Sequence, residues 1–157
     1  MQHDFFEDFR LLLEGKKLVI VGVGNRRHGD DGLGPAMIDR LRGKLDVPLI
    51  DAGDVPENSL GPIEAARADL ALVIDAADLR AAPGDLALLE LDQLGEMAVS
   101  THTVNLGALF KVIPPKRRPR VFVLAVQPET TAPGSGLSLA VRSALDGIES
   151  LLLGVVA

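Results

Sequence analysis

None of the 157 residues of this sequence is a cysteine. Disulfides, thiolate nucleophiles and thiolate metal sites are therefore excluded, so any metal held by side chains must use histidine and carboxylates. Tryptophan and tyrosine are absent as well, which leaves five phenylalanines as platforms for aromatic stacking. We therefore do not expect this chain to recognise nucleic-acid bases by stacking.

An excess of positive charge and a long apolar segment are also missing. The 16 Lys and Arg residues are outnumbered by 22 Asp and Glu residues, and the formal net charge of −6 argues against a nucleic-acid-binding surface. No segment approaches the roughly 20 apolar residues of a membrane-spanning helix. Residues 1–17 lack the pattern of a signal peptide, because acidic residues interrupt their short apolar run. We expect a single cytoplasmic domain over residues 1–157 that does not insert into a membrane.

What the sequence does contain is a regular alternation of strand and helix patterns. Five apolar runs are typical of buried strands: 17–24, 47–53, 70–78, 86–91 and 120–129. Apolar residues at helical spacing, or capping residues, indicate five helices: 4–13, 36–45, 59–68, 100–113 and 135–156. This alternation predicts an α/β fold, a three-layer α/β/α sandwich in which helices cover both faces of a mostly parallel sheet.

The segment GNRRHGDDGLGP, residues 24–35, joins the first strand pattern to a helix. Glycine-rich turns in this position often hold phosphate, but the third glycine of the dinucleotide fingerprint and the Gly-Lys-Ser/Thr of a P-loop are both missing. Asp30 and Asp31 in front of a helix would repel phosphate and attract a cation. We interpret the glycines as permitting a tight turn. We expect one of the two aspartates to cap the helix, and the acids of this loop to face a cation or an amide.

Polar side chains follow several of the predicted strands, and ligands of an open parallel sheet bind beyond the carboxyl ends of its strands. These candidates are Asn25, His28, Asp30, Asp31, Asp51, Asp54, Glu57, Asn58, Asp75, Asp78, His102, Gln127 and Glu129. Asp75 ends an apolar strand, and a buried carboxylate is costly unless it is paired or bound to a cation; the alternative is a turn-forming aspartate with satisfied hydrogen bonds. His102 by itself is more often a capping or packing histidine than a ligand. Together, Asp31, Asp75 and His102 suit a first-row divalent metal or zinc.

The run of like charge KRRPR, residues 116–120, lies between the fourth helix pattern and the last strand pattern. We interpret it as a solvated loop, because most such runs have no further role. The alternative is a docking patch for an acidic partner.

Six segments, taken in their order and spacing, resemble the maturation endopeptidases of [NiFe] hydrogenases. They are GVGNRRHGDDGLGP, DAGDVPENS, LVIDAAD, APGDL, STHTVNL and AVQPE. The resemblance covers residues 17–153, and the subgroup that it fits best is the protease for hydrogenase 3. It implies a twisted five-stranded sheet with one antiparallel strand, for which we choose 86–91. It also implies a cytoplasmic protease that removes a C-terminal extension from the hydrogenase large-subunit precursor after nickel has been inserted.

The same resemblance implies a metal site made by Asp31, Asp75 and His102. Many relatives have glutamate at the first of these positions, where this sequence has the shorter Asp31. We expect the precursor to supply the nickel, with zinc or cadmium as possible substitutes, so that a precursor without nickel is not cleaved.

The hydrolytic chemistry stays open at this point, as does the choice between enzyme and binding module. An activated water is the expected nucleophile, generated by the metal or by Asp31 or Asp75 as general base. The aspartic-protease label of such enzymes does not imply a paired-aspartate mechanism here. Two other functions use the same residues. One is a non-catalytic nickel-binding or chaperone module of hydrogenase assembly, and the other is a metal-dependent hydrolase of small amides.

Overall fold

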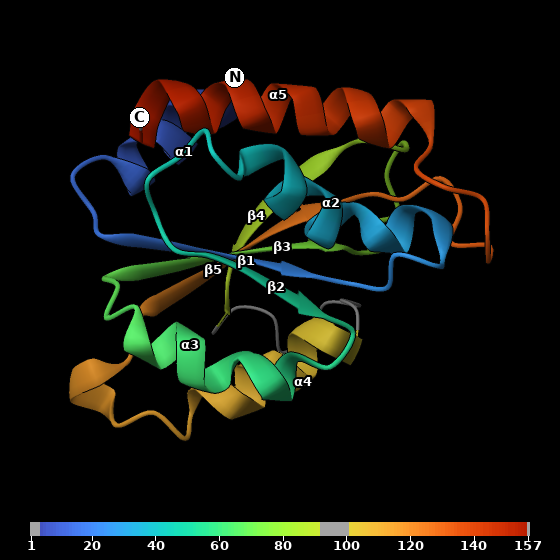
Figure 1. The fold of residues 1–157 in the computed structure, drawn as a ribbon. Helices are drawn as coiled ribbons and strands as arrows, with labels where there is room; N and C mark the ends of the chain where they lie inside the picture. Colours follow the sequence, from blue (N-terminus) through green and yellow to red (C-terminus); the bar gives the residue numbers. More distant parts are fainter. Residues whose placement is uncertain (1–3, 92–100, 157) are drawn as a thin grey trace.

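The computed structural model describes residues 4–91 and 101–156, with the backbone alone for 101–105. Five strands form one sheet: β1 (Leu18–Val23), β2 (Leu49–Gly53), β3 (Leu70–Ala76), β4 (Leu86–Glu90) and β5 (Arg120–Val126). Their order is β2-β1-β3-β5-β4 (Figure 1). Strand β4 is antiparallel to β5, and the other three pairings are parallel. The predicted mostly parallel sheet with one antiparallel strand, the fourth, is therefore confirmed.

The direction of β4 follows from the length of the segment that leads to it. A parallel crossover needs a dozen or more residues and usually contains a helix. Only residues 77–85 separate β3 from β4, and they contain no helix. The chain therefore turns back and adds β4 on the far side of β5 in the antiparallel direction.

Helices cover both faces of the sheet, as the alternation of patterns predicts. The helices are α1 (Phe5–Leu13), α2 (Leu33–Leu41), α3 (Leu60–Ala65), α4 (Thr101–Phe110) and α5 (Leu139–Val156). Figure 1 shows α1, α2 and α5 on one face and α3 and α4 on the other. None of the helices in the described ranges is long and apolar enough to cross a bilayer.

Two hydrophobic cores result, one on each face of the sheet. Alternate strand residues such as Ile20, Leu72 and Leu124 pack with α1, α2 and α5. Their neighbours, such as Val21 and Val73, pack with α3 and α4. All residues of β1 and β3 are buried, which explains their uninterrupted apolar runs.

Short 3-10 turns precede two of the helices, at Gly29–Gly32 (η1) and Pro56–Ser59 (η2), and a third occupies Pro115–Arg117 (η4). The helix expected from Ser59 or Pro62 to residue 68 begins at Leu60, after a turn, and ends earlier, at Ala65. In this strand order the connection after β1 runs to one side of the sheet, to β2, and the connection after the adjacent β3 runs to the other side, to β4. This is the topological switch point at which open α/β sheets bind ligands.

Candidate active site

The glycines after β1 let the backbone turn back closely onto the sheet. Gly24 has a φ of 141°, and a Cβ there would overlap the carbonyl oxygen of Asp31. A Cβ on Gly34 would overlap backbone atoms of Val23 and Ile74. Glycine at these two positions therefore brings the loop and the first turn of α2 against the ends of β1 and β3, which confirms the interpretation of the glycines as turn residues.

Asp30 is fully buried and ties this loop to a distant part of the chain. Its Oδ1 accepts a hydrogen bond from the backbone N–H of Ser138 at 2.7 Å. Its Oδ2 accepts from the Ser138 hydroxyl at 2.8 Å and from the N–H groups of Glu129 and Thr130 at 2.9 and 3.3 Å. Ser138 in turn caps the start of α5, because its Oγ accepts from the N–H of Val141. Asp30 therefore holds the segment between β5 and α5 in place.

The expectation that Asp30 or Asp31 caps the following helix is wrong. The N-cap of α2 is Gly32, and no side chain caps it. The turn η1 that contains both aspartates has no side-chain cap either. Asp30 instead accepts hydrogen bonds from residues about a hundred positions away, and a partner that distant is invisible to local capping rules.

The hydrogen-bond donors around Asp30 stabilise its ionised form. Burial by itself would raise the pKa of this carboxyl, but hydrogen bonds from Ser138, Glu129 and Thr130 outweigh it and hold the pKa below its ordinary value. Asp30 is therefore a permanently ionised structural anchor at neutral pH.

Asp31 lies in a different environment, although it is the next residue. Its side chain is half-buried, and its Oδ2 accepts a hydrogen bond from the N–H of Asn25 at 3.0 Å. Within the part of the chain that the structure describes, its Oδ1 accepts no hydrogen bond. Asp31 therefore keeps a carboxylate oxygen available for a ligand or a water molecule.

Asn25 explains why the loop keeps its shape around Asp31. Its backbone N–H donates a hydrogen bond to Asp31. Its side-chain Oδ1 accepts a hydrogen bond from the N–H of Arg27 at 2.9 Å. Its Nδ2 donates to Asp54, in the loop after β2, at 3.2 Å. One side chain thus closes the local turn and links it to the neighbouring loop.

Asp75 is fully buried near the carboxyl end of β3. Because side chains alternate along a strand, Asp75 shares a face with Val73 and Ala77, both of which pack in the core formed with α3 and α4. The turn η1 packs against β3, so Asp31 and Asp75 come from neighbouring elements at the same edge of the sheet.

His102 lies in the first turn of α4, and its side chain is outside the described residues. Helix α4 packs against η2, and Figure 1 shows its yellow start below the arrowhead end of β2, at the carboxyl edge. Among the described side chains, which do not include that of His102, no group of three or more His, Asp or Glu could hold a metal. The convergence of Asp31, Asp75 and His102 therefore stays a prediction.

Two further side chains shape this edge. Arg26 forms ion pairs with Asp39 and Asp51, each at 2.6 Å, and these carboxylates raise its pKa.

Gln127, just after β5, accepts a hydrogen bond from the N–H of Leu79 at 2.6 Å and so fixes the loop after β3. Gln127 is among the polar candidates that the sequence predicts, whereas Ser138 is not, because its role depends on its contact in space with Asp30.

Comparison with known proteins identifies the family. The sequence model of the hydrogenase maturation proteases matches residues 36–155. The chain is 28% identical to the hydrogenase 3 maturation protease of Escherichia coli K12, over 87% of this chain and 88% of that protein. It is 29% identical to a putative hydrogenase maturation protease of Methanocaldococcus jannaschii, over 92% of this chain and 99% of that one.

Solved structures agree with these matches. The crystal structure of a [NiFe] hydrogenase maturation protease of Thermococcus kodakarensis is similar with a TM-score of 0.84 at 27% identity, covering 95% of this chain and 98% of that one. The crystal structure of the hydrogenase 3 maturation protease is similar with a TM-score of 0.74 at 27% identity, covering 87% and 88%. From its sequence and its fold, the chain belongs to the hydrogenase maturation proteases, a family of peptidases.

Proposed function

We propose that this chain removes the C-terminal extension of a [NiFe] hydrogenase large-subunit precursor after nickel insertion, and that Asp31, Asp75 and His102 contact the nickel carried by that precursor. The observation that supports this proposal most is the position of Asp31 and Asp75. Asp31 lies in η1, in the loop after β1, and Asp75 lies near the end of the neighbouring parallel strand β3, at the switch point where such sheets bind ligands.

The donor set suits the proposed metal. Two carboxylates and an imidazole are ligands that bind first-row divalent ions, and the absence of cysteine leaves the remaining positions to the precursor. Asp75 faces the layer that contains α4, and His102 lies in the first turn of that helix. Bound in the precursor, the nickel would act as a Lewis acid at the peptide bond to be cleaved.

Both aspartates contact the nickel in this proposal, and one of them has a second role. Asp75 is buried, and a buried carboxylate is stabilised by a nearby cation, so it serves as a ligand. Asp31 is half-buried and keeps Oδ1 available, so a water molecule can reach it. Asp31 is therefore the better candidate to accept the proton of the attacking water, with Asn25 holding the opposite carboxylate oxygen in place.

The substrate belongs, in this proposal, to the hydrogenase 3 type. The similarity to the Escherichia coli hydrogenase 3 maturation protease over most of both chains supports this choice. The proposed site of action is the cytoplasm, where the precursor receives its metal.

The test is the intact mass of a purified hydrogenase 3-type precursor before and after incubation with this protein. The precursor is used in two forms, loaded with nickel and free of nickel. We expect loss of the C-terminal extension from the loaded form alone. Cleavage of both forms at the same rate would contradict recognition through nickel, and cleavage of neither would contradict the proposed substrate.

A further inference from the structure

The end of the sheet opposite the candidate active site has an open hollow of about 610 Å³. Three segments line it: the exposed side of α3, residues 67–69 between α3 and β3, and residues 116–118 before β5. Residues 67–69 lead directly into the amino end of β3, whereas Asp75 lies near its carboxyl end. The hollow is therefore about 20 Å from Asp75 along the strand.

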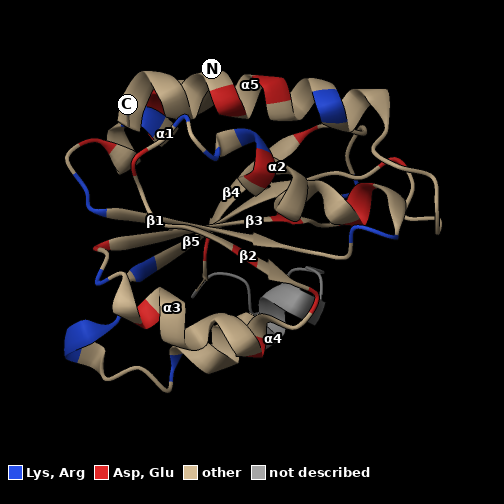
Figure 2. Ribbon diagram, in the orientation of Figure 1, with Lys and Arg blue, Asp and Glu red and all other residues tan. Residues whose placement is uncertain are grey.

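The lining is more basic than the rest of the chain. Four cationic side chains and two carboxylates contribute to it: Arg67, Lys116, Arg117, Arg118, Glu64 and Asp69. The whole chain carries a formal charge of −6, so this is a local reversal of its charge. Figure 2 shows the corresponding basic turn before the start of β5, at the lower left, on the side of the molecule opposite the carboxyl edge.

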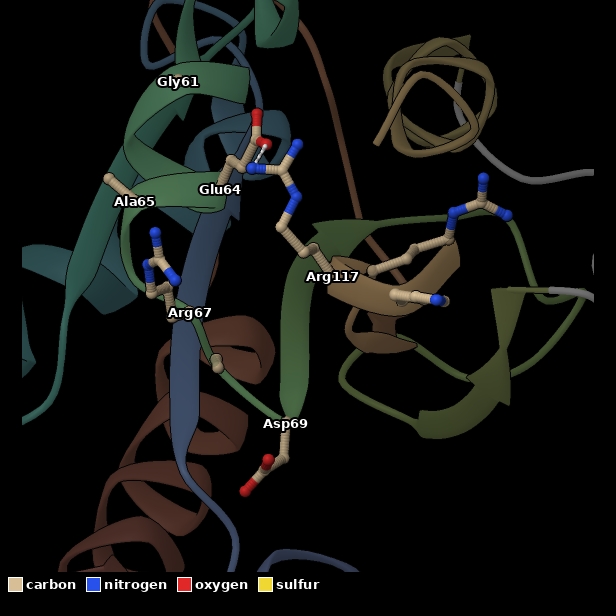
Figure 3. A pocket seen from close by; sticks show the side chains of 9 residues that line it. Gly61, Glu64, Ala65, Arg67, Asp69 and Arg117 are labelled. Carbon is tan, nitrogen blue, oxygen red and sulfur yellow. Dashed lines mark ion pairs between the residues drawn. The ribbon is translucent and has the colours of Figure 1, made fainter. Parts of the chain in front are cut away.

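Two of the four cations are engaged within the protein. Arg118 donates hydrogen bonds to the carbonyl oxygens of Lys111 and Ile113, just after the end of α4. Arg117 reaches across the hollow to Glu64 at 3.4 Å, and Figure 3 shows this pair. Because both side chains of the pair are exposed, the pair adds little stability. It does show that a carboxylate is accommodated against this turn.

The other two cations, Arg67 and Lys116, are exposed. Neither side chain forms a hydrogen bond or an ion pair with any described residue. Arg67 has a φ of 47° just after the C-cap of α3, a place where helices usually have glycine. An arginine side chain is therefore kept beside the hollow at a backbone position that does not favour it.

The other three residues that line the hollow are small. Gly61, Ala65 and Ala68 follow each other along the side of α3 and the turn after it. A Cβ on Gly61 would meet no atom within 4 Å. The small residues therefore leave open space beside the charged side chains of the lining.

We propose that this hollow is a docking site for an acidic segment of a protein partner. Arginine binds carboxylates through paired N–H groups, and the carboxylate of Glu64 already lies 3.4 Å from the guanidinium of Arg117. The lining contains no aromatic residue for stacking bases, and the net charge of the chain repels a nucleic acid. The cations reach the hollow on long exposed side chains, which fits a spread of carboxylates better than one compact phosphate.

The probe is an end-blocked octaglutamate peptide with a fluorescent label, whose binding is followed by anisotropy at low ionic strength. An octaglutamine peptide with the same label is the neutral control. We expect the octaglutamate peptide to bind, with an affinity that falls as salt is added, and the octaglutamine peptide not to bind. Equal binding of both peptides would overturn the proposal.

Three variants test whether the octaglutamate peptide binds in the hollow. Arg67→Gly removes a cation and relieves an unfavourable backbone conformation, so it keeps the fold. Gly61→Glu adds a carboxylate to the hollow in the first turn of α3, where open space and the helix dipole both favour it. Lys116→Ala removes the second exposed cation. Each should weaken octaglutamate binding by about three- to tenfold while the melting temperature is maintained.

Arg80→Gly is the matched control, because Arg80 is also exposed with a φ of 54°, but follows the carboxyl end of β3. We expect wild-type affinity for octaglutamate from Arg80→Gly. If it weakens binding as much as Arg67→Gly, the attraction is diffuse and the docking site is wrong. Complete displacement of the peptide by inorganic phosphate, at a concentration equal to that of the peptide carboxylates, would overturn the proposal in favour of a small-anion site.

Discussion

The two edges of the sheet hold their charged groups in opposite ways. At the carboxyl edge, Asp30 and Asp75 are fully buried, and the partners of Asp30 are three backbone N–H groups and the Ser138 hydroxyl. At the opposite edge, where the amino ends of the parallel strands lie (the amino edge), Arg67 and Lys116 are exposed and have long, flexible side chains. Buried and hydrogen-bonded charges fix a geometry, whereas exposed charges attract a partner from a distance at low cost in stability. This difference supports our two proposals, hydrolysis at the first edge and docking at the second.

The carboxyl edge contains a second contrast, between adjacent residues. The carboxylate of Asp30 accepts four hydrogen bonds. The carboxylate of Asp31 accepts one hydrogen bond from the described residues, and its side chain is half-buried. The same side chain thus serves as an anchor at one position and is left available for a ligand at the next. Variants that separate stability from activity test this division.

The largest effect is expected from Asp31→Asn. Asparagine keeps the size of the side chain and can still accept from the N–H of Asn25, so the melting temperature should be unchanged. The variant loses the charge that a metal ligand or a general base requires, and cleavage of the nickel-loaded precursor should fall by about two to four powers of ten. Cleavage rates and thermal melts on the same preparation measure both quantities. Full activity in this variant would show that Asp31 is not part of the site.

The next effect is expected from Asp30→Asn and appears in stability. The amide group would direct N–H donors at the N–H groups and hydroxyl that now point to a carboxylate. We expect a loss of about 2–3 kcal/mol in the free energy of unfolding, which denaturant titration measures. Ser138→Ala is the graded control, since it removes one donor to Asp30 together with a helix cap, for about 1–2 kcal/mol. An unchanged unfolding midpoint in Asp30→Asn would refute its role as an anchor.

A smaller effect is expected from His102→Ala on the binding of free nickel. Three ligands without a thiolate should hold a free ion weakly, and loss of the imidazole should weaken binding by more than tenfold. Isothermal titration calorimetry with nickel, repeated with zinc, compares the variant with the wild type. Indistinguishable isotherms would make His102 a structural residue of α4.

The smallest effects concern the basic turn at the amino edge. Arg118→Ala removes the hydrogen bonds to the carbonyl oxygens of Lys111 and Ile113, and should cost about 1 kcal/mol of stability. Arg117→Ala breaks only an exposed ion pair with Glu64, and should change stability by less than about 0.5 kcal/mol. Urea unfolding of the two variants distinguishes them. Equal losses would mean that Arg117 is also part of the packed structure.

The fold follows from the sequence because its signals are local. The continuous apolar runs of β1 and β3 identify buried parallel strands, and the short segment 77–85 leaves no room for a crossover helix. The glycines of residues 24–35 likewise indicate a close turn, which Gly24 and Gly34 make.

The site is less predictable because its contacts are distant in sequence. Asp30 and Asp31 look alike in the motif, and only the approach of Ser138 and residues 129–130 separates their roles. Arg118 is a second example. The run of basic residues that contains it predicts a solvated side chain, but Arg118 donates hydrogen bonds to carbonyl oxygens just after α4. The neighbours of His102 in the sequence predict its position at the start of a helix, which α4 confirms, and its ligand role stays a prediction.

The central claim is that the carboxyl edge of the sheet hydrolyses a peptide bond and does not merely hold nickel. The most direct measurement mixes this protein with nickel-loaded precursor, separates bound from free species by gel filtration, and records the intact mass of the precursor in each. We predict a precursor shortened at its C-terminus, released from the protein. A precursor that stays bound at its full mass would contradict the claim and identify a nickel-binding chaperone.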